Sequence, residues 1–143
     1  MSLVSYAAKL AIKPKGPVEE AIFEHIWQQT PIETVLAALM QSDVFLYTQK
    51  SDGSHGPDPK PLASQGGDGK PVMLVFTTKE RAAAIAKQLP PGSSEGMTQP
   101  FKEVLRWAPI ELGLAINSGS ALAAECAAAH MDALRQQAGI FRP

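Results

Sequence analysis

The 143-residue sequence has little of several features that mark particular classes of protein. Its one cysteine, Cys126, excludes an internal disulfide, which is typical of proteins in a reducing compartment. It has no apolar run of about 18 residues, and its N-terminus lacks the pattern of a secretory signal. A formal net charge of -1 provides no broad field for nucleic acid or anionic lipid. We therefore expect a cytoplasmic protein that binds neither nucleic acid nor membrane.

What is present is an ordinary globular composition, with 45% hydrophobic and 19% charged residues. The length favours one domain over residues 1–143, without a second, C-terminal domain. Within it, residues 1–30 are expected to form an N-terminal extension and a helix, where 1–16 fit helix and strand equally well. Residues 50–70 contain five glycines and three prolines, which predicts a flexible polar loop.

The stretch "TPIE", Thr30 to Glu33, is the clearest helix start in the sequence. Thr30 can cap the helix, Pro31 has its φ preset, and Glu33 can complete a capping box. Apolar residues then recur at helical intervals as far as Met40, which indicates a buried stripe. An earlier helix is predicted over Val18–Gln28.

Three short apolar stretches predict strands at residues 44–48, 71–77 and 112–116, and further helices are predicted at 78–89, 100–107 and 121–137. Strands separated by helices favour an α/β domain with some parallel pairing, and α+β is the alternative. The small mixed sheet would have about three to five strands, the extra ones from the N-terminus or the polar loop. The predicted core comprises Leu36, Leu39, Val75, Phe76, Leu114 and Ile116.

The stretch "GLAINSGS", Gly113 to Ser120, has two interpretations. Asn117 and Gly119 suit a turn that needs positive φ, and Ser118 or Ser120 can cap the predicted helix that follows. Asn117–Ser120 would then be a structural corner, or an anion-binding site at a helix N-terminus. The spacing of phosphate-binding glycine motifs and their lysine are missing, which favours the structural corner.

The remaining candidates for chemistry are isolated residues. Cys126 and His130 are four apart on the predicted last helix, but no further residues complete a metal or catalytic site, and His55 lies in the polar loop without calcium-loop spacing. We therefore predict no catalytic residue, no metal and no cofactor. Trp27 and Trp107 sit at helical spacing from apolar neighbours and are predicted to pack in the core. Four glutamates are assigned to a solvated face and to caps: Glu19, Glu20, Glu24 and Glu33.

Three stretches taken in order, "ETVLAALMQSDVFLYT", "PVMLVFTTKERA" and "GLAINSGS", resemble the N-terminal domain family of SseB, named for enhanced serine sensitivity. Bacterial members share such a helix–strand entry, a strand–helix joint and a turn of the form "G-l-x-l-N-P-G". The resemblance covers residues 32–125, and "LVFTTKERA" is its most specific part. Ser118 replaces the usual proline, which makes the turn less rigid. The resemblance implies the fold and supplies no catalytic residue.

These observations favour a non-enzymatic module that binds an unidentified protein or has a regulatory role. Two alternatives remain. One is a small-ligand or enzyme site at Asn117–Ser120, with the polar loop as a lid. The other is a structural subunit of a homodimer.

Overall fold

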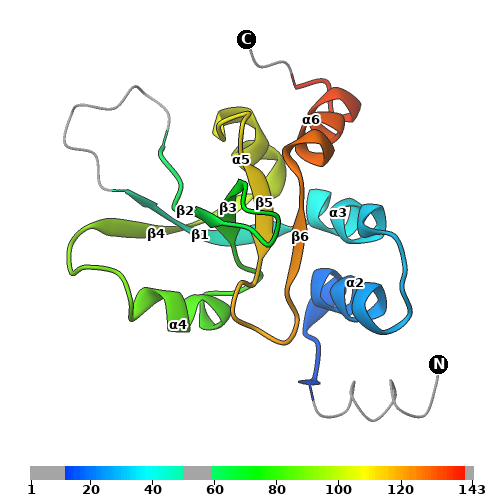
Figure 1. Cartoon of the computed structure of the whole chain (residues 1–143), viewed down its shortest axis with the longest axis horizontal. Coiled ribbons are helices and arrows are strands. Elements are labelled where there is room, and N and C mark those ends of the chain that lie inside the picture. The colour runs from blue at the N-terminus through cyan, green and yellow to red at the C-terminus, as the bar shows by residue number, and fades with distance from the viewer. Residues whose placement is uncertain (1–11, 50–58, 141–143) are drawn as a thin grey trace.

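The computed structural model describes residues 12–49 and 59–140 (Figure 1). No helix in these ranges is long and apolar enough to cross a membrane. The elements are, in order, α2 Gly16–Trp27, α3 Ile32–Met40, β1 Asp43–Gln49, β2 Ala63–Gln65, β3 Pro71–Val75, a 3-10 turn Glu80–Ala82, α4 Ala83–Ala86, β4 Ser94–Pro100, α5 Phe101–Trp107, β5 Gly113–Ile116, β6 Ala124–Cys126 and α6 Ala128–Gln137.

The larger of two sheets has four strands in the order β2-β3-β5-β6. β3 and β5 run parallel, with Val72 opposite Gly113 and Val75 opposite Ile116. β2 pairs with β3, and β6 with β5, in antiparallel fashion. The fold is therefore a mixed α/β arrangement, and the predicted parallel pairing is confirmed.

β1 and β4 form a second, two-stranded antiparallel sheet, in register from Asp43 opposite Pro100 to Gln49 opposite Ser94. Phe45 in β1 and Phe76, just after β3, exchange both backbone hydrogen bonds at 2.8 Å. This bridge joins the two sheets, because it pairs β1 of the smaller sheet with the residue that follows β3 of the larger sheet.

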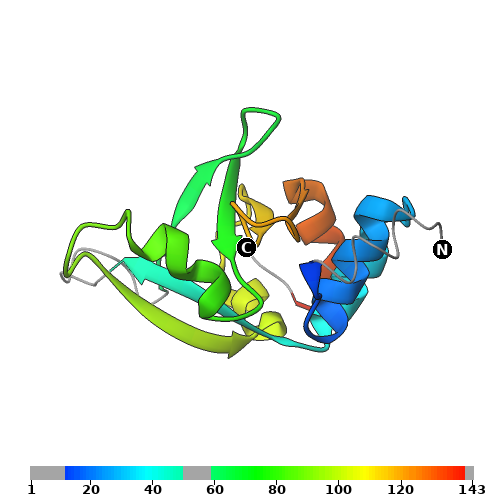
Figure 2. The ribbon, with the colours of Figure 1, turned by 90° about the horizontal axis from the view of Figure 1, so that it is seen from below.

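Both faces of the larger sheet are covered by helices. α2 and α3 lie on one side and α4 lies on the other (Figures 1 and 2). Met73 and Val75 belong to the main core with residues of α2 and α3, whereas Val72 and Leu74 belong to a second cluster with Ala82, the last residue before α4. Burial on both faces explains why β3 is continuously apolar. The six predicted core residues are all buried, with at most 2% of their surface exposed.

The last helix is shorter than the predicted span of residues 121–137, because β6 occupies part of it. Leu122, Ala124 and Cys126 are buried while Glu125 between them is exposed, which is the two-residue period of a strand. Pairing with β5 provides hydrogen-bond partners for the backbone of this segment. That gain outweighs the small helix preference of its alanines.

Two other predictions also need correction. No strand was predicted between the helices at 78–89 and 100–107, yet residues 94–100 form β4, because this polar segment pairs along the whole of β1. The helix predicted over 78–89 is reduced to the 3-10 turn and α4. After α4, Gln88 and Leu89 bond to carbonyls three residues back, so the chain tightens before the two prolines that follow.

The polar loop is described only in part. Residues 63–65 form β2, which confirms that part of the loop adds a strand. Residues 50–58 and the N-terminal residues 1–11 lie outside the described ranges, so the predictions for them remain predictions.

The predicted capping box at Thr30 does not form. The Thr30 hydroxyl has no hydrogen-bond partner in the described chain, and α3 begins after Pro31 without a side-chain cap. The Thr30 carbonyl instead accepts a hydrogen bond from His25 Nδ1 at 2.6 Å. Because a carbonyl only accepts, Nδ1 carries the proton. Thr30 thus closes the connection between α2 and α3.

The core assignment predicts the cost of truncating Leu39, which is fully buried in α3. Leu39→Ala should lower the free energy of unfolding by about 2–5 kcal/mol, measured by urea denaturation. Ile110→Ala is the control, since Ile110 is 45% exposed and its truncation should change stability by about 0.5 kcal/mol or less. Equal effects of the two substitutions would contradict the core assignment.

Candidate functional site

The predicted turn lies at the carboxyl ends of the two parallel strands. Asn117 follows β5 directly, is fully buried and has a φ of 54°. Its backbone N–H donates to the Val75 carbonyl at 2.9 Å, and its Oδ1 accepts from the Thr77 N–H at 2.9 Å. Its Nδ2 donates to Thr77 Oγ1 at 3.0 Å and to the Leu122 carbonyl at 3.2 Å. Asn117 therefore ties β3, β5 and the approach to β6 together.

Ser118, Gly119 and Ser120 complete this turn. Gly119 has a φ of 85°, so positive φ is confirmed at both predicted positions. Ser120 Oγ accepts from the Leu122 N–H at 3.1 Å, but the expected helix cap is wrong, because a strand follows. The anion hypothesis for Asn117–Ser120 depended on a helix N-terminus at this point, which the structure does not place there. Ligand binding by the turn remains a prediction.

Glu19 connects this turn to α2. Predicted on a solvated face, it is in fact fully buried. Arg81 donates to it from Nε at 3.0 Å and from Nη2 at 2.8 Å. The Thr77 hydroxyl donates at 2.5 Å and the Lys15 N–H at 2.9 Å. A continuous polar chain thus runs from Asn117 through Thr77 and Glu19 to Arg81.

The hydrogen bonds decide the charge of Glu19. Burial alone would raise the pKa of the carboxyl group, because it penalises the charged form. The hydrogen bonds from Arg81, from Thr77 and from the Lys15 backbone together outweigh burial, so the pKa of Glu19 lies below its ordinary value of 4.5. The same pairing raises the pKa of Arg81. Glu19 is therefore an ionised carboxylate that holds α2 against the sheet.

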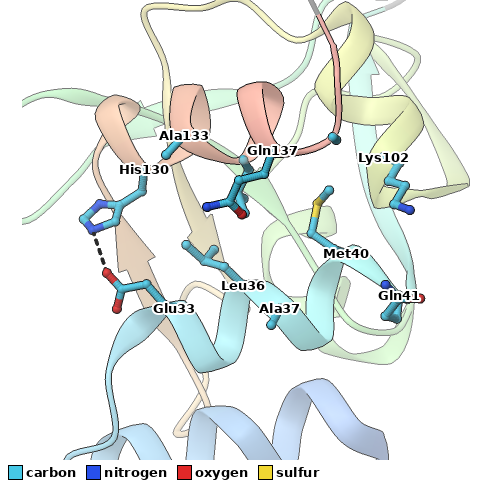
Figure 3. A pocket seen from close by; sticks show the side chains of 11 residues that line it. Glu33, Leu36, Ala37, Met40, Gln41, Lys102, His130, Ala133 and Gln137 are labelled. Atoms are coloured by element: carbon cyan, nitrogen blue, oxygen red, sulfur yellow. Dashed lines mark ion pairs between the residues drawn. The ribbon is translucent and has the colours of Figure 1, made fainter.

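A groove of about 510 Å³ lies between α3 and α6 (Figure 3). α3 and the residue after it contribute the positions i, i+3, i+4, i+7 and i+8 from Glu33, and α6 and the residue after it contribute the same positions from His130. Such spacing places each set on one face of its helix. The two helices run in the same direction, since Glu33 faces His130 and both sets proceed from there.

The middle of the groove combines apolar side chains with the amide of Gln137, and its ends are charged (Figure 3). Leu36 and Ala133 are among the residues that line the middle. At one end, Glu33 Oε1 lies 3.7 Å from His130 Nε2, which is an ion pair when the imidazole is protonated. Lys102 of α5 lies at the other end (Figure 3). An apolar surface with polar groups at defined positions is typical of a binding site.

Sequence reasoning missed this site. It assigned Glu33 to a cap, found no partner for His130 and did not single out Lys102. The available signal was Ala37, an exposed apolar residue of α3 beside the buried stripe that ends at Met40.

The other predicted candidates lie apart from one another. Cys126 is in β6 and His130 is in α6, so they do not share a helix face. Burial raises the pKa of the Cys126 thiol to about 11, which keeps it protonated at neutral pH and makes it a poor nucleophile. His55 lies outside the described ranges. Among the residues that the structure describes, no cluster of three or more His, Cys, Asp or Glu side chains is arranged to hold a metal.

The two tryptophans differ. Trp107 is half-buried against the main core, as predicted, and its Nε1 donates to Gln99 Oε1 at 3.0 Å. Trp27 is 40% exposed and stacks on Phe23 with 6.1 Å between ring centroids, so its predicted core position is wrong.

The family assignment agrees with this architecture. The model of the SseB protein N-terminal domain matches residues 18–132, which contain the Asn117 turn and most of the groove. The chain therefore belongs to the SseB N-terminal domain family. No curated protein and no solved structure matches it.

The buried amide of Asn117 predicts the effect of removing it. Asn117→Ala leaves the Thr77 N–H and the Leu122 carbonyl without this partner, so stability should fall by more than about 2 kcal/mol in urea denaturation. Asn117→Gly should recover about 1 kcal/mol, since glycine tolerates positive φ. A loss no greater than that of Ser118→Ala would show that the amide does not hold the turn.

The Glu19–Arg81 pair predicts a change in the pH dependence of stability. In the parent, the lowered pKa of Glu19 contributes stability above about pH 4.5 that is lost as the pH falls through the folded value. Arg81→Met leaves a buried carboxylate without its cation, which should cost about 3–5 kcal/mol at neutral pH.

Losing Arg81 removes the largest cause that lowers the pKa of Glu19, so this pKa is higher in the variant than in the parent. The difference in stability should therefore shrink as the pH falls, first as the variant carboxyl and then as the parent carboxyl becomes protonated. Urea denaturation across the pH range measures this, with Lys79→Met as the exposed control. A loss that does not depend on pH would contradict the assigned charge of Glu19.

Proposed function

We propose that this SseB-family domain is a non-enzymatic protein-binding module whose groove between α3 and α6 takes an amphipathic helix of a partner protein. The observation that carries the proposal is the pair of matched faces from Glu33 and from His130, which together line an open channel with both apolar and polar side chains. Helix-in-groove recognition uses such channels, with apolar anchors at i, i+3, i+4 and i+7. The cytoplasmic location expected from the single cysteine is part of this proposal.

The shape of the lining supports a helical occupant. Ala37 and Ala133 expose small side chains on the two walls, so the backbone of a helix can approach closely between them. The groove-lining positions from Glu33 to Gln41, just after α3, span about 12 Å at 1.5 Å per residue, which matches roughly two turns of a bound helix. The groove volume also falls in the range of small-ligand pockets, so a metabolite is the competing occupant.

A binding role also agrees with how the polar groups of the fold are used. The Asn117 amide and the Glu19 carboxylate are engaged by neighbouring residues, and the Cys126 thiol is protonated. A nucleophilic site requires a nucleophile that a neighbouring base or a lowered pKa activates. The polar chain is better suited to holding α2 in place than to chemistry.

Site-specific photo-cross-linking tests this function. A photoreactive amino acid at Ala37 or Ala133, both exposed in the groove, should cross-link in cells to one partner segment with apolar residues at helical spacing. The same amino acid at Ala84, exposed on the opposite side of the sheet, is the matched control. Mass spectrometry identifies the linked peptides.

The purified partner then provides the quantitative test. Ala133→Arg should weaken binding at least about tenfold, whereas Ala84→Arg should leave it unchanged, and both should melt near the parent temperature. Cross-links at Ala84 equal to those in the groove, links only to a second copy, or a bound metabolite without a protein partner would each overturn the proposal.

A further inference from the structure

The charged residues of the groove lie at its two ends, separated by a middle that carries no charged side chain. Of the lining residues, Glu33, His130 and Lys102 can carry charge, and Lys102 is at the end opposite the other two (Figure 3). In the described part of the chain, no carboxylate forms an ion pair with Lys102, and no lysine or arginine pairs with Glu33. The charge of Lys102 is therefore available to a partner, and so is that of Glu33 when the His130 imidazole is neutral.

The directions of α3 and α6 add a second electrostatic constraint. Both helices begin at the Glu33 end, so their carboxyl-terminal ends, with partial negative charge, lie toward Lys102. A helix bound antiparallel to them would place its positive N-terminus at those ends and its negative C-terminus at the beginnings of α3 and α6. Its helix dipole is then antiparallel to the dipoles of α3 and α6. This arrangement is favourable because it brings partial charges of opposite sign together at both ends.

We propose that the groove selects a partner helix that runs antiparallel to α3 and α6, with an acidic residue near its start against Lys102 and a basic residue about seven positions later against Glu33. This inference rests on the proposed function and adds the charge order of the partner to it. Seven residues make about two turns, so the two charges share one face with the apolar anchors between them. Acid near the start and base near the end also suit the bound helix's own dipole.

A displayed library of amphipathic helical peptides tests the charge order. The apolar anchors are fixed, and the two flanking positions, seven apart, each vary among Glu, Gln and Lys. The baits are the parent, the charge-reversed variant Glu33→Lys with Lys102→Glu, and Ala133→Arg as the blocked groove. Selection at low salt and about pH 8, above the range where histidines ordinarily titrate, keeps imidazole charge from offsetting the carboxylate.

Acid-first peptides carry Glu at the first varied position and Lys at the second, and base-first peptides carry the reverse. The parent should enrich acid-first over base-first peptides by at least about fivefold, because the acid-first order forms two exposed ion pairs and the base-first order brings two pairs of like charges together. The charge-reversed variant should enrich the base-first peptides instead, and both preferences should weaken at high salt. The blocked variant should bind neither class.

Two failures are distinguishable. This inference is overturned if the peptides bind the parent but not Ala133→Arg and show no preferred charge order. It is also overturned if they keep the same order with the charge-reversed bait. In both cases the proposed function still stands. If no peptide distinguishes the parent from Ala133→Arg, the proposed function is overturned as well. Circular dichroism of each variant confirms that its helices are intact before selection.

Discussion

The amide of Asn117 is the contact on which the arrangement of the layers depends. Asn117 itself follows β5, and its amide bonds to Thr77 after β3 and to the Leu122 carbonyl before β6. Through Thr77 it reaches the buried carboxylate of Glu19 on α2. α2 packs against α3, which forms one wall of the groove. Buried polar groups tolerate few arrangements, because each needs its partner away from water. A turn far from the groove thereby helps to position its wall.

The groove and the polar chain have opposite characters. The donors and acceptors of the polar chain bond to one another, so it stabilises the fold and offers little to a ligand. The groove leaves apolar side chains and the charges of Glu33 and Lys102 at the surface. When a complementary surface covers exposed apolar side chains, their removal from water lowers the free energy of the complex. This contrast is why we assign recognition to the groove and a structural role to Asn117.

Predictions from sequence succeeded where the local pattern of apolar residues matches the burial of the segment in the fold. β3 and β5 are buried on both faces, and their continuous apolar runs reveal them. β4 and β6 were missed because their stability comes from pairing with β1 and β5, which local sequence does not encode. The sequence of β4 is mostly polar and has no alternation of apolar and polar residues. The alanines around β6 favour a helix when they are considered alone.

The sequence by itself determined the class of fold, the six core residues, the positive φ of Asn117 and Gly119, and the family. These follow from periodicity, side-chain volume and backbone sterics, which act over a few neighbouring residues. Only the tertiary structure decided that Glu19 is buried and paired with Arg81, and that Glu33, His130 and Lys102 lie around one groove. Such contacts join residues about 30 to 100 positions apart, and whether a charged side chain meets solvent or a partner depends on how the layers pack.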